Sequence, residues 1–120
     1  MKRILFYLLS IIPLLGSASA AHAAELVMFE APRCAWCEAW TKEIGPIYPK
    51  TEEAARAPLR RVDLTQKPLP ADIKTKEPVR MTPTFVLVDD GGEEIGRITG
   101  YAGDEMFWWQ LDNLMEALED

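Results

Sequence analysis

The stretch Ala31-Pro-Arg-Cys-Ala-Trp-Cys-Glu38 contains the only two cysteines of the chain, Cys34 and Cys37, separated by two residues. It follows the short apolar run of residues 26–29, which predicts a β-strand, and it opens residues 34–44, whose apolar side chains recur at helical spacing. A Cys-x-x-Cys motif placed between a strand and a helix is typical of a thiol–disulfide redox site. We therefore take dithiol chemistry as the leading interpretation.

Three other interpretations of the two cysteines stay open. A permanent structural disulfide is disfavoured because a bridge between residues so close in sequence adds little chain-entropy stabilisation. A Cu(I)-binding module would use Cys34, Cys37 and the thioether of Met28 or Met81, since copper(I) prefers soft sulfur ligands. The third is a redox-inert interaction domain. We expect no bound metal and no cofactor other than the Cys34–Cys37 disulfide itself.

The first residues of the chain have the three parts of a secretory signal peptide. A basic start, Met1-Lys-Arg3, precedes an apolar run over residues 4–16 and a segment of small residues over 17–24. A membrane anchor is the alternative, but the apolar run is shorter than the roughly 20 residues that span a bilayer. We predict that residues 1–23 are cleaved, with Ala20 or Ala24 as other possible cleavage points, and that residues 24–120 form one soluble domain in the periplasm, where disulfides persist.

Charge and histidine content exclude several classes of function. The chain has 19 acidic and 13 basic residues, so its formal charge is −6, and cleavage of Lys2 and Arg3 makes it more acidic still. An acidic domain of this kind does not bind nucleic acid by electrostatic attraction. The single histidine, His22, lies in the predicted signal peptide. The mature domain therefore lacks the imidazole that Cys/His zinc sites, Cys–His dyads and Ser–His–Asp triads require.

The remaining pattern predicts an α/β domain with the element order β-α-β-α-β-β-α. An Asp-Gly hairpin turn at residues 89–92 implies an antiparallel pair, and a strand–helix–strand unit at the start implies a parallel pair, so we expect a mixed four-stranded sheet flanked by helices. The predicted strands are residues 25–30, 59–65, 85–88 and 94–99. The predicted helices are residues 34–44, interrupted at Gly45-Pro46 and resumed over residues 50–57, then residues 71–76 and 104–119.

Together with this element order, two motifs resemble the thioredoxin superfamily. Cys34-Ala-Trp-Cys37 stands where that family has its active site, and Met81-Thr82-Pro83-Thr84 resembles its cis-proline loop. The resemblance implies a minimal thioredoxin-like fold, because the family's additional N-terminal strand and helix are missing. Gly100-Tyr-Ala-Gly103, followed by Phe107-Trp108, is similar to small periplasmic thioredoxin-like proteins, among them the SoxS type of sulfur-oxidation systems.

The chain departs from thioredoxin at the site itself. The dipeptide between the cysteines is Ala-Trp rather than Gly-Pro, Arg33 replaces the tryptophan before the first cysteine, and Met28 stands where the family has a buried acid. We expect Glu30 or Glu38 to substitute for that acid as a proton relay through water. Each of these carboxylates is otherwise an ordinary solvated side chain.

The position of the cysteines at a helix start suggests their separate roles. Free backbone N–H groups and the helix dipole stabilise a thiolate at Cys34, which we assign as the nucleophile, and Cys37, one turn further, is the resolving thiol. Arg33 would further stabilise the Cys34 thiolate, and exposed Trp36 would contact a partner. The resemblance implies that Pro83 is cis and that Thr82 and Pro83 face the cysteines and bind an extended substrate.

These features predict a periplasmic thiol–disulfide oxidoreductase that exchanges disulfides with protein substrates and contributes to redox homeostasis. We favour a monomeric reductase that is recharged by a membrane thiol transporter. A thiol oxidase of the same fold is the alternative, because exchange proteins range from about −270 mV to about −120 mV in potential.

Overall fold

The computed structural model describes residues 16 and 23–118. The predicted signal peptide therefore lies almost entirely outside the described residues. Within the part that is described, no helix is both long and apolar enough to cross a membrane. The strands are β1 (Glu25–Glu30), β2 (Leu59–Asp63), β3 (Thr84–Val88) and β4 (Glu94–Thr99); the α-helices are α1 (Ala35–Glu43), α2 (Glu52–Arg56) and α3 (Asp104–Met115), and the 3-10 helices are Tyr48–Lys50 and Glu116–Leu118.

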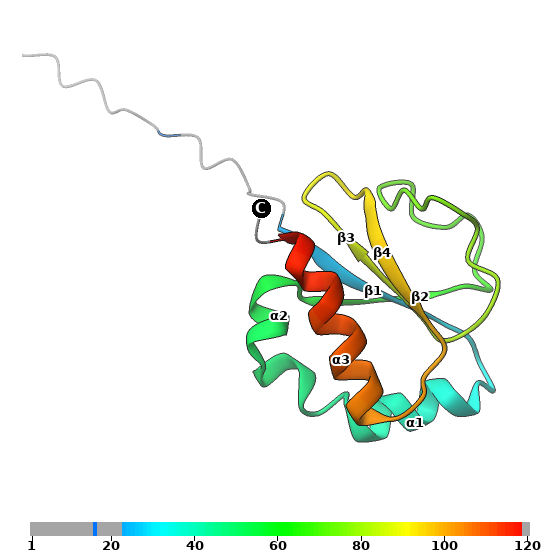
Figure 1. Cartoon of the computed structure of the whole chain (residues 1–120). Coiled ribbons are helices and arrows are strands. Elements are labelled where there is room, and N and C mark those ends of the chain that lie inside the picture. The colour runs from blue at the N-terminus through cyan, green and yellow to red at the C-terminus, as the bar shows by residue number, and fades with distance from the viewer. Residues whose placement is uncertain (1–15, 17–22, 119–120) are drawn as a thin grey trace, which may run out of the picture.

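The four strands form one mixed sheet in the order β2-β1-β3-β4 (Figure 1). Strand β1 pairs in parallel with β2 and antiparallel with β3, and β3 pairs antiparallel with β4. This confirms the predicted mixed four-stranded sheet. The site-bearing segment after β1 leaves one end of the sheet, whereas the β3–β4 hairpin closes the opposite end, because Glu25 is paired with Val88.

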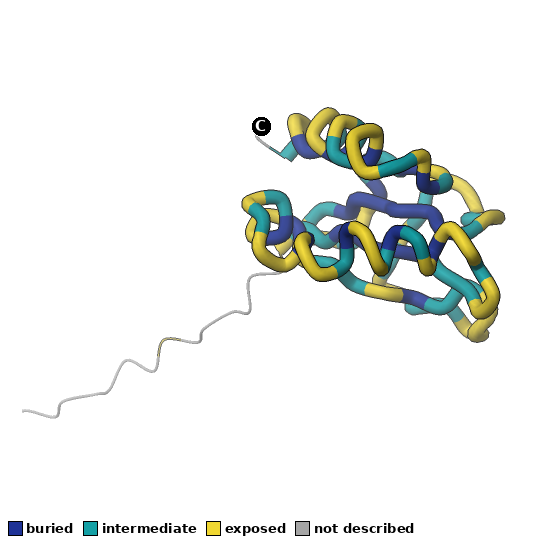
Figure 2. The backbone as a smooth tube through the Cα atoms, turned by 90° about the horizontal axis from the view of Figure 1, so that it is seen from below, coloured by how far each residue is buried: buried dark blue, intermediate teal, exposed yellow. Residues whose placement is uncertain are grey.

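Helices α1 and α3 cover one face of the sheet with an aromatic core. Successive residues of a strand point to opposite faces, so Leu26 and Met28 of β1 join this core while their neighbours face away. Trp40 of α1 lies at its centre, fully buried, with its ring centroid 5.1 Å from that of Phe85 and 5.6 Å from that of Phe107. Figure 2 shows the buried backbone, in dark blue, in the middle of the molecule beneath the helices. The core fixes the direction of α1 and hence of its N-terminus.

The second face of the sheet is covered by a long loop rather than by a helix. Apolar side chains of this loop, residues 64–83, pack against Val27, Phe29 and their neighbours on β2 and β3. The prediction of a short helix over residues 71–76 is wrong. The amide of Lys74 donates to Gly92 O at 2.8 Å and forms an isolated parallel bridge with Glu93, so its backbone is used to bind the hairpin instead of a helical turn.

The helix ends follow local capping signals. The hydroxyl of Thr51, a residue type favoured at the N-cap, accepts a hydrogen bond from the amide of Ala54 and starts α2. Helix α1 begins one residue after Cys34, which is its N-cap residue and whose sulfur accepts a hydrogen bond from the amide of Cys37. The last predicted helix tightens into a 3-10 turn over Glu116–Leu118. Strand β2 ends two residues earlier than predicted, at Asp63, where the carboxylate turns back to accept from the amide of Thr65.

Candidate redox site

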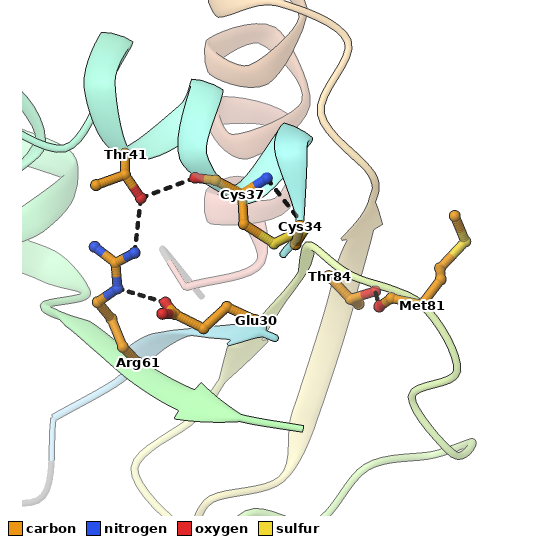
Figure 3. Close-up of a disulfide and its surroundings, with 7 residues drawn as sticks. All are labelled: Glu30, Cys34, Cys37, Thr41, Arg61, Met81 and Thr84. Carbon is orange, nitrogen blue, oxygen red and sulfur yellow. Dashed lines mark hydrogen bonds and ion pairs between the residues drawn. A yellow bond between two sulfur atoms is a disulfide. The ribbon is translucent and has the colours of Figure 1, made fainter. Parts of the chain in front are cut away.

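Cys34 and Cys37 form a disulfide at the N-terminus of α1 (Figure 3). Their Cα atoms are 5.2 Å apart, and the amide of Cys37 donates to the sulfur of Cys34 at 3.2 Å. Cys34 is partly exposed, whereas Cys37 is 5% exposed and belongs to the aromatic core. The two sulfurs therefore differ in access: a partner can reach Cys34, and Cys37 faces the interior.

The chain reaches the disulfide through a tight turn after β1. Arg33 has φ of 59°, a left-handed backbone conformation that is uncommon for a residue with a side chain. This turn leaves the Arg33 side chain exposed, next to Cys34 in sequence. Trp36, between the two cysteines, is 63% exposed. Arg33 and Trp36 are therefore exposed side chains on either side of Cys34 in the sequence.

A second segment, residues 81–84, lies beside the cysteines in Figure 3. The Thr82–Pro83 peptide bond is cis, Pro83 is buried and Thr82 is partly exposed. The segment is held by the hydroxyl of Thr84, which donates to Met81 O at 2.7 Å, and by the amide of Gly100, which donates to Pro83 O at 2.7 Å. Met81 itself is 53% exposed.

An ion pair and two hydrogen bonds connect the neighbouring strands to Cys37. The guanidinium of Arg61 donates from Nε to Glu30 Oε2 at 2.5 Å and from Nη2 to the hydroxyl of Thr41 at 2.7 Å. That hydroxyl donates in turn to Cys37 O at 2.8 Å (Figure 3). The network thus joins strands β1 and β2 to the first turn of α1.

The same network borders an open cleft of about 400 Å³ that Cys37 also lines. Both predicted relay carboxylates, Glu30 and Glu38, lie on this cleft, Glu30 partly exposed and Glu38 exposed. Met28 is fully buried and supplies no ionisable group. Cys37 and the charged side chains of Glu30, Glu38 and Arg61 therefore line one cleft.

Sequence reasoning missed Arg61 and Thr41. Arg61 stands opposite Met28 in the parallel register of β1 and β2, and its side chain passes over the ring of Trp40, 6.0 Å from the centroid. The alternation along β2 places Arg61 on the helix-covered face, which was the one available signal, but the partner strand and its register could not be read from that alternation.

No group of three or more His, Cys, Asp or Glu side chains that could hold a metal ion occurs within residues 16 and 23–118. Figure 3 shows the Met81 thioether pointing away from the two cysteine sulfurs. The Met81 thioether is therefore not placed as a copper ligand beside the disulfide, whereas Met28 is buried in the same apolar cluster as Cys37.

Comparisons with known proteins agree with this geometry. A thioredoxin-like domain model matches residues 15–115. The crystal structure of the periplasmic thioredoxin SoxS from Paracoccus pantotrophus, in its reduced form, is 43% identical, covers 78% of this chain and 96% of that one, and superimposes with a TM-score of 0.74. A thioredoxin of Malassezia sympodialis, 20% identical over 78% of this chain and 76% of its own, has a TM-score of 0.52 and shows the fold alone. A search of the curated proteins finds no match.

The family match and the Cys-x-x-Cys disulfide together establish the type of chemistry. Thiol–disulfide exchange requires an accessible sulfur and a second sulfur close enough to resolve the mixed disulfide, and Cys34 and Cys37 meet both conditions. The chain thus belongs to the thioredoxin superfamily, in which it is similar to the periplasmic thioredoxin SoxS, and it is a thiol–disulfide oxidoreductase.

Proposed function

We propose that the mature protein is a periplasmic reductase of disulfides in a partner protein. The observation that carries this proposal is the asymmetric disulfide, with Cys34 accessible at the N-cap of α1 and Cys37 buried one turn away. In the reduced protein, the Cys34 thiolate attacks the partner's disulfide, one partner sulfur leaves as a thiol, and a mixed disulfide forms. Cys37 then displaces the second partner sulfur and closes the Cys34–Cys37 disulfide, so the partner gains two electrons.

Export is part of the same proposal. We place the cleavage site after residue 23, so that residues 24–120 form the mature domain. Ala23 is exposed, whereas Ala24 packs against the core and β1 begins at Glu25, so a cut between the two alanines would leave the fold intact. Similarity to a periplasmic thioredoxin also supports this location.

The surface around Cys34 suits an extended segment of a partner protein. Trp36 and Met81 expose apolar side chains, and Thr82 is partly exposed next to the buried Pro83. Extended peptides bind such loops through main-chain hydrogen bonds, and the adjacent side chains select among them. Arg33 would stabilise the Cys34 thiolate and contact the partner. We expect the domain to act as a monomer.

The direction of electron flow requires a source of electrons. We propose that a membrane thiol transporter reduces the Cys34–Cys37 disulfide after each turnover. The alternative is an oxidase of the same fold, and the equilibrium potential separates the two. A potential near about −270 mV with insulin-reduction activity supports the reductase, whereas a potential above about −150 mV contradicts it.

A trapping experiment tests the exchange with protein substrates. In Cys37→Ala, resolution is blocked, so Cys34 should retain its partners as mixed disulfides that are isolated from the periplasm and identified by mass spectrometry. The double variant Cys34→Ala/Cys37→Ala is the matched control and should retain none. If Cys37→Ala captures no protein while its Cys34 still reacts with iodoacetamide, the proposed action on protein disulfides is wrong.

A further inference from the structure

The buried position of Cys37 raises a chemical problem for the proposed reductase. Resolution requires a thiolate, and a thiol in an apolar core has a raised pKa, because burial disfavours the charged form. Cys37 is 5% exposed among the aromatic residues that surround Trp40. Something at the site must therefore take the Cys37 proton when the mixed disulfide forms.

The charged groups that face Cys37 can be enumerated from the cleft that it lines. They are Glu30 from β1, Arg33 from the turn after it, Arg61 from β2, and Glu38 and Lys42 from α1. Only the two carboxylates can accept a proton. Glu38 is exposed at the cleft mouth, and no ion pair or hydrogen bond fixes its carboxylate among the described residues.

Glu30 differs from Glu38 because its carboxylate is held in one place. Arg61 Nε binds Oε2 at 2.5 Å, and Arg61 is itself anchored by Thr41, whose hydroxyl donates to Cys37 O at 2.8 Å. Within the described residues, Oε1 of Glu30 receives no hydrogen bond, and the Glu30 side chain lines the cleft. A general base must be held within reach of its proton, directly or through one water molecule.

We propose that Glu30 accepts the proton of Cys37 through a water molecule in this cleft, and that Arg61 is the residue that positions the Glu30 carboxylate for it. The proposal rests on the exchange chemistry described above and deepens it. Arg61 acts through the Glu30 carboxylate and Thr41 through the carbonyl of Cys37, and their hydrogen bonds in the described part of the chain go to these groups and not to the sulfurs.

The step balances as follows. In the mixed disulfide, the Cys37 thiol gives its proton through water to Glu30, and the resulting thiolate attacks the sulfur of Cys34. The bond between Cys34 and the partner breaks, and the partner's sulfur leaves with the bonding electron pair. The proton on Glu30 passes to solvent or to the departing thiolate, so no oxidant or reductant beyond the partner disulfide is needed.

The experiment follows the two exchange steps separately in the mature domain. Reduced protein is mixed with oxidised glutathione as the model disulfide, samples are quenched in acid, and the glutathione mixed disulfide of Cys34 is quantified by mass spectrometry between pH 5.5 and 8. Its appearance measures capture by Cys34, and its decay measures resolution by Cys37. We compare Glu30→Gln, Arg61→Gln and their double variant with Glu93→Gln, a control at the exposed hairpin carboxylate near Lys74.

In Glu30→Gln we expect resolution to slow by roughly tenfold or more near pH 6.5, because general bases contribute at least that factor. Its rate should also become nearly proportional to hydroxide concentration, while capture stays within about twofold of the wild-type rate. Arg61→Gln should slow resolution less, and the double variant should be no slower than Glu30→Gln alone, since Arg61 acts through Glu30. Glu93→Gln should match the wild type in both steps.

The inference is overturned if Glu30→Gln resolves at the wild-type rate with the wild-type pH profile, or if Glu38→Gln reproduces the slowing instead. Additive effects of Glu30→Gln and Arg61→Gln would also reject the positioning role and indicate a merely structural one. These results leave capture intact, so they differ from failure of the proposed function, in which Cys34 of the wild-type protein would not form the mixed disulfide.

Discussion

We predict that the substitution Gly92→Ala lowers the stability of the domain and leaves its redox function unchanged. It lies in the β3–β4 hairpin with φ of +80°, and a Cβ built on it would stand 1.9 Å from the carbonyl oxygen of Asp72. Its own carbonyl accepts from the amide of Lys74 at 2.8 Å. The substitution Gly92→Ala therefore strains the turn and pushes away the loop of residues 64–83 that covers one face of the sheet.

The expected loss of stability follows from these two contacts. A left-handed conformation costs a residue with a Cβ about 1–2 kcal/mol. Displacing Asp72 also weakens the hydrogen bond of Lys74 to Gly92, which contributes about 1 kcal/mol. We expect Gly92→Ala to lower the free energy of unfolding by about 2–3 kcal/mol, which shifts the melting temperature of a domain of this size by on the order of 10–20 °C.

The assay is urea unfolding of the oxidised mature domain, followed by circular dichroism. Gly91→Ala is the matched control, because its Cβ would meet only the side chain of Asp89, at 3.4 Å. Exchange at Cys34 should be unchanged in both variants at temperatures where they are folded, since the hairpin and the disulfide lie at opposite ends of the sheet. A free energy of unfolding for Gly92→Ala within about 0.5 kcal/mol of that for Gly91→Ala would refute the reasoning.

Two further predictions concern buried groups whose protonation is linked to stability. The Tyr48 hydroxyl donates to Ala57 O at 2.6 Å and burial raises its pKa, so Tyr48→Phe should cost about 1–2 kcal/mol at pH 7. The folded state holds Tyr48 neutral, so the stability that its hydroxyl contributes is complete below about pH 10 and declines above it. In urea unfolding at increasing pH, the free energy of unfolding of Tyr48→Phe should therefore fall less steeply in the alkaline range than that of the wild type. Equal slopes for the two proteins would contradict this. Glu94 accepts from Arg97 and from the amide of Lys76, and the hydrogen bond from Arg97 holds its pKa below the usual range. The ionised Glu94 carboxylate therefore stabilises the fold at pH values above that usual range, and this stabilisation is lost as the pH falls through the folded pKa. In thermal unfolding, Glu94→Gln should lower the free energy of unfolding by about 1–3 kcal/mol at pH 7 and by much less near pH 3. A loss of stability that is the same at both pH values would argue against this linkage.

The sequence was sufficient for features that are encoded locally. The alternation of β1, the capping hydroxyl of Thr51 and the Asp-Gly turn each depend on residues a few positions apart, so the strands, α1 and the hairpin could be placed to within two residues. The redox character of Cys34 and Cys37 was equally local, because three residues and a helix start are enough to define it.

The loop that covers the second face of the sheet could not be predicted from local sequence. The prediction of a helix over residues 71–76 failed because the amides of Lys74 and Lys76 bind Gly92 and Glu94, which lie about eighteen residues further along the chain. Prolines at positions 68, 70 and 78 limit helix length in this segment, and only the folded hairpin offers its backbone the alternative partners.

The sequence by itself therefore determined the family, the dithiol motif, and which cysteine of the disulfide is exposed and which is buried. It also named Glu30 as one of two carboxylates near the site. Only the tertiary structure distinguished them, because the parallel register of β1 and β2 brings Arg61 against Glu30 from 31 positions away and ties both, through Thr41, to Cys37. A residue's own sequence neighbourhood sets its chemistry, but the position of its charge relative to a buried sulfur depends on how separate strands pair.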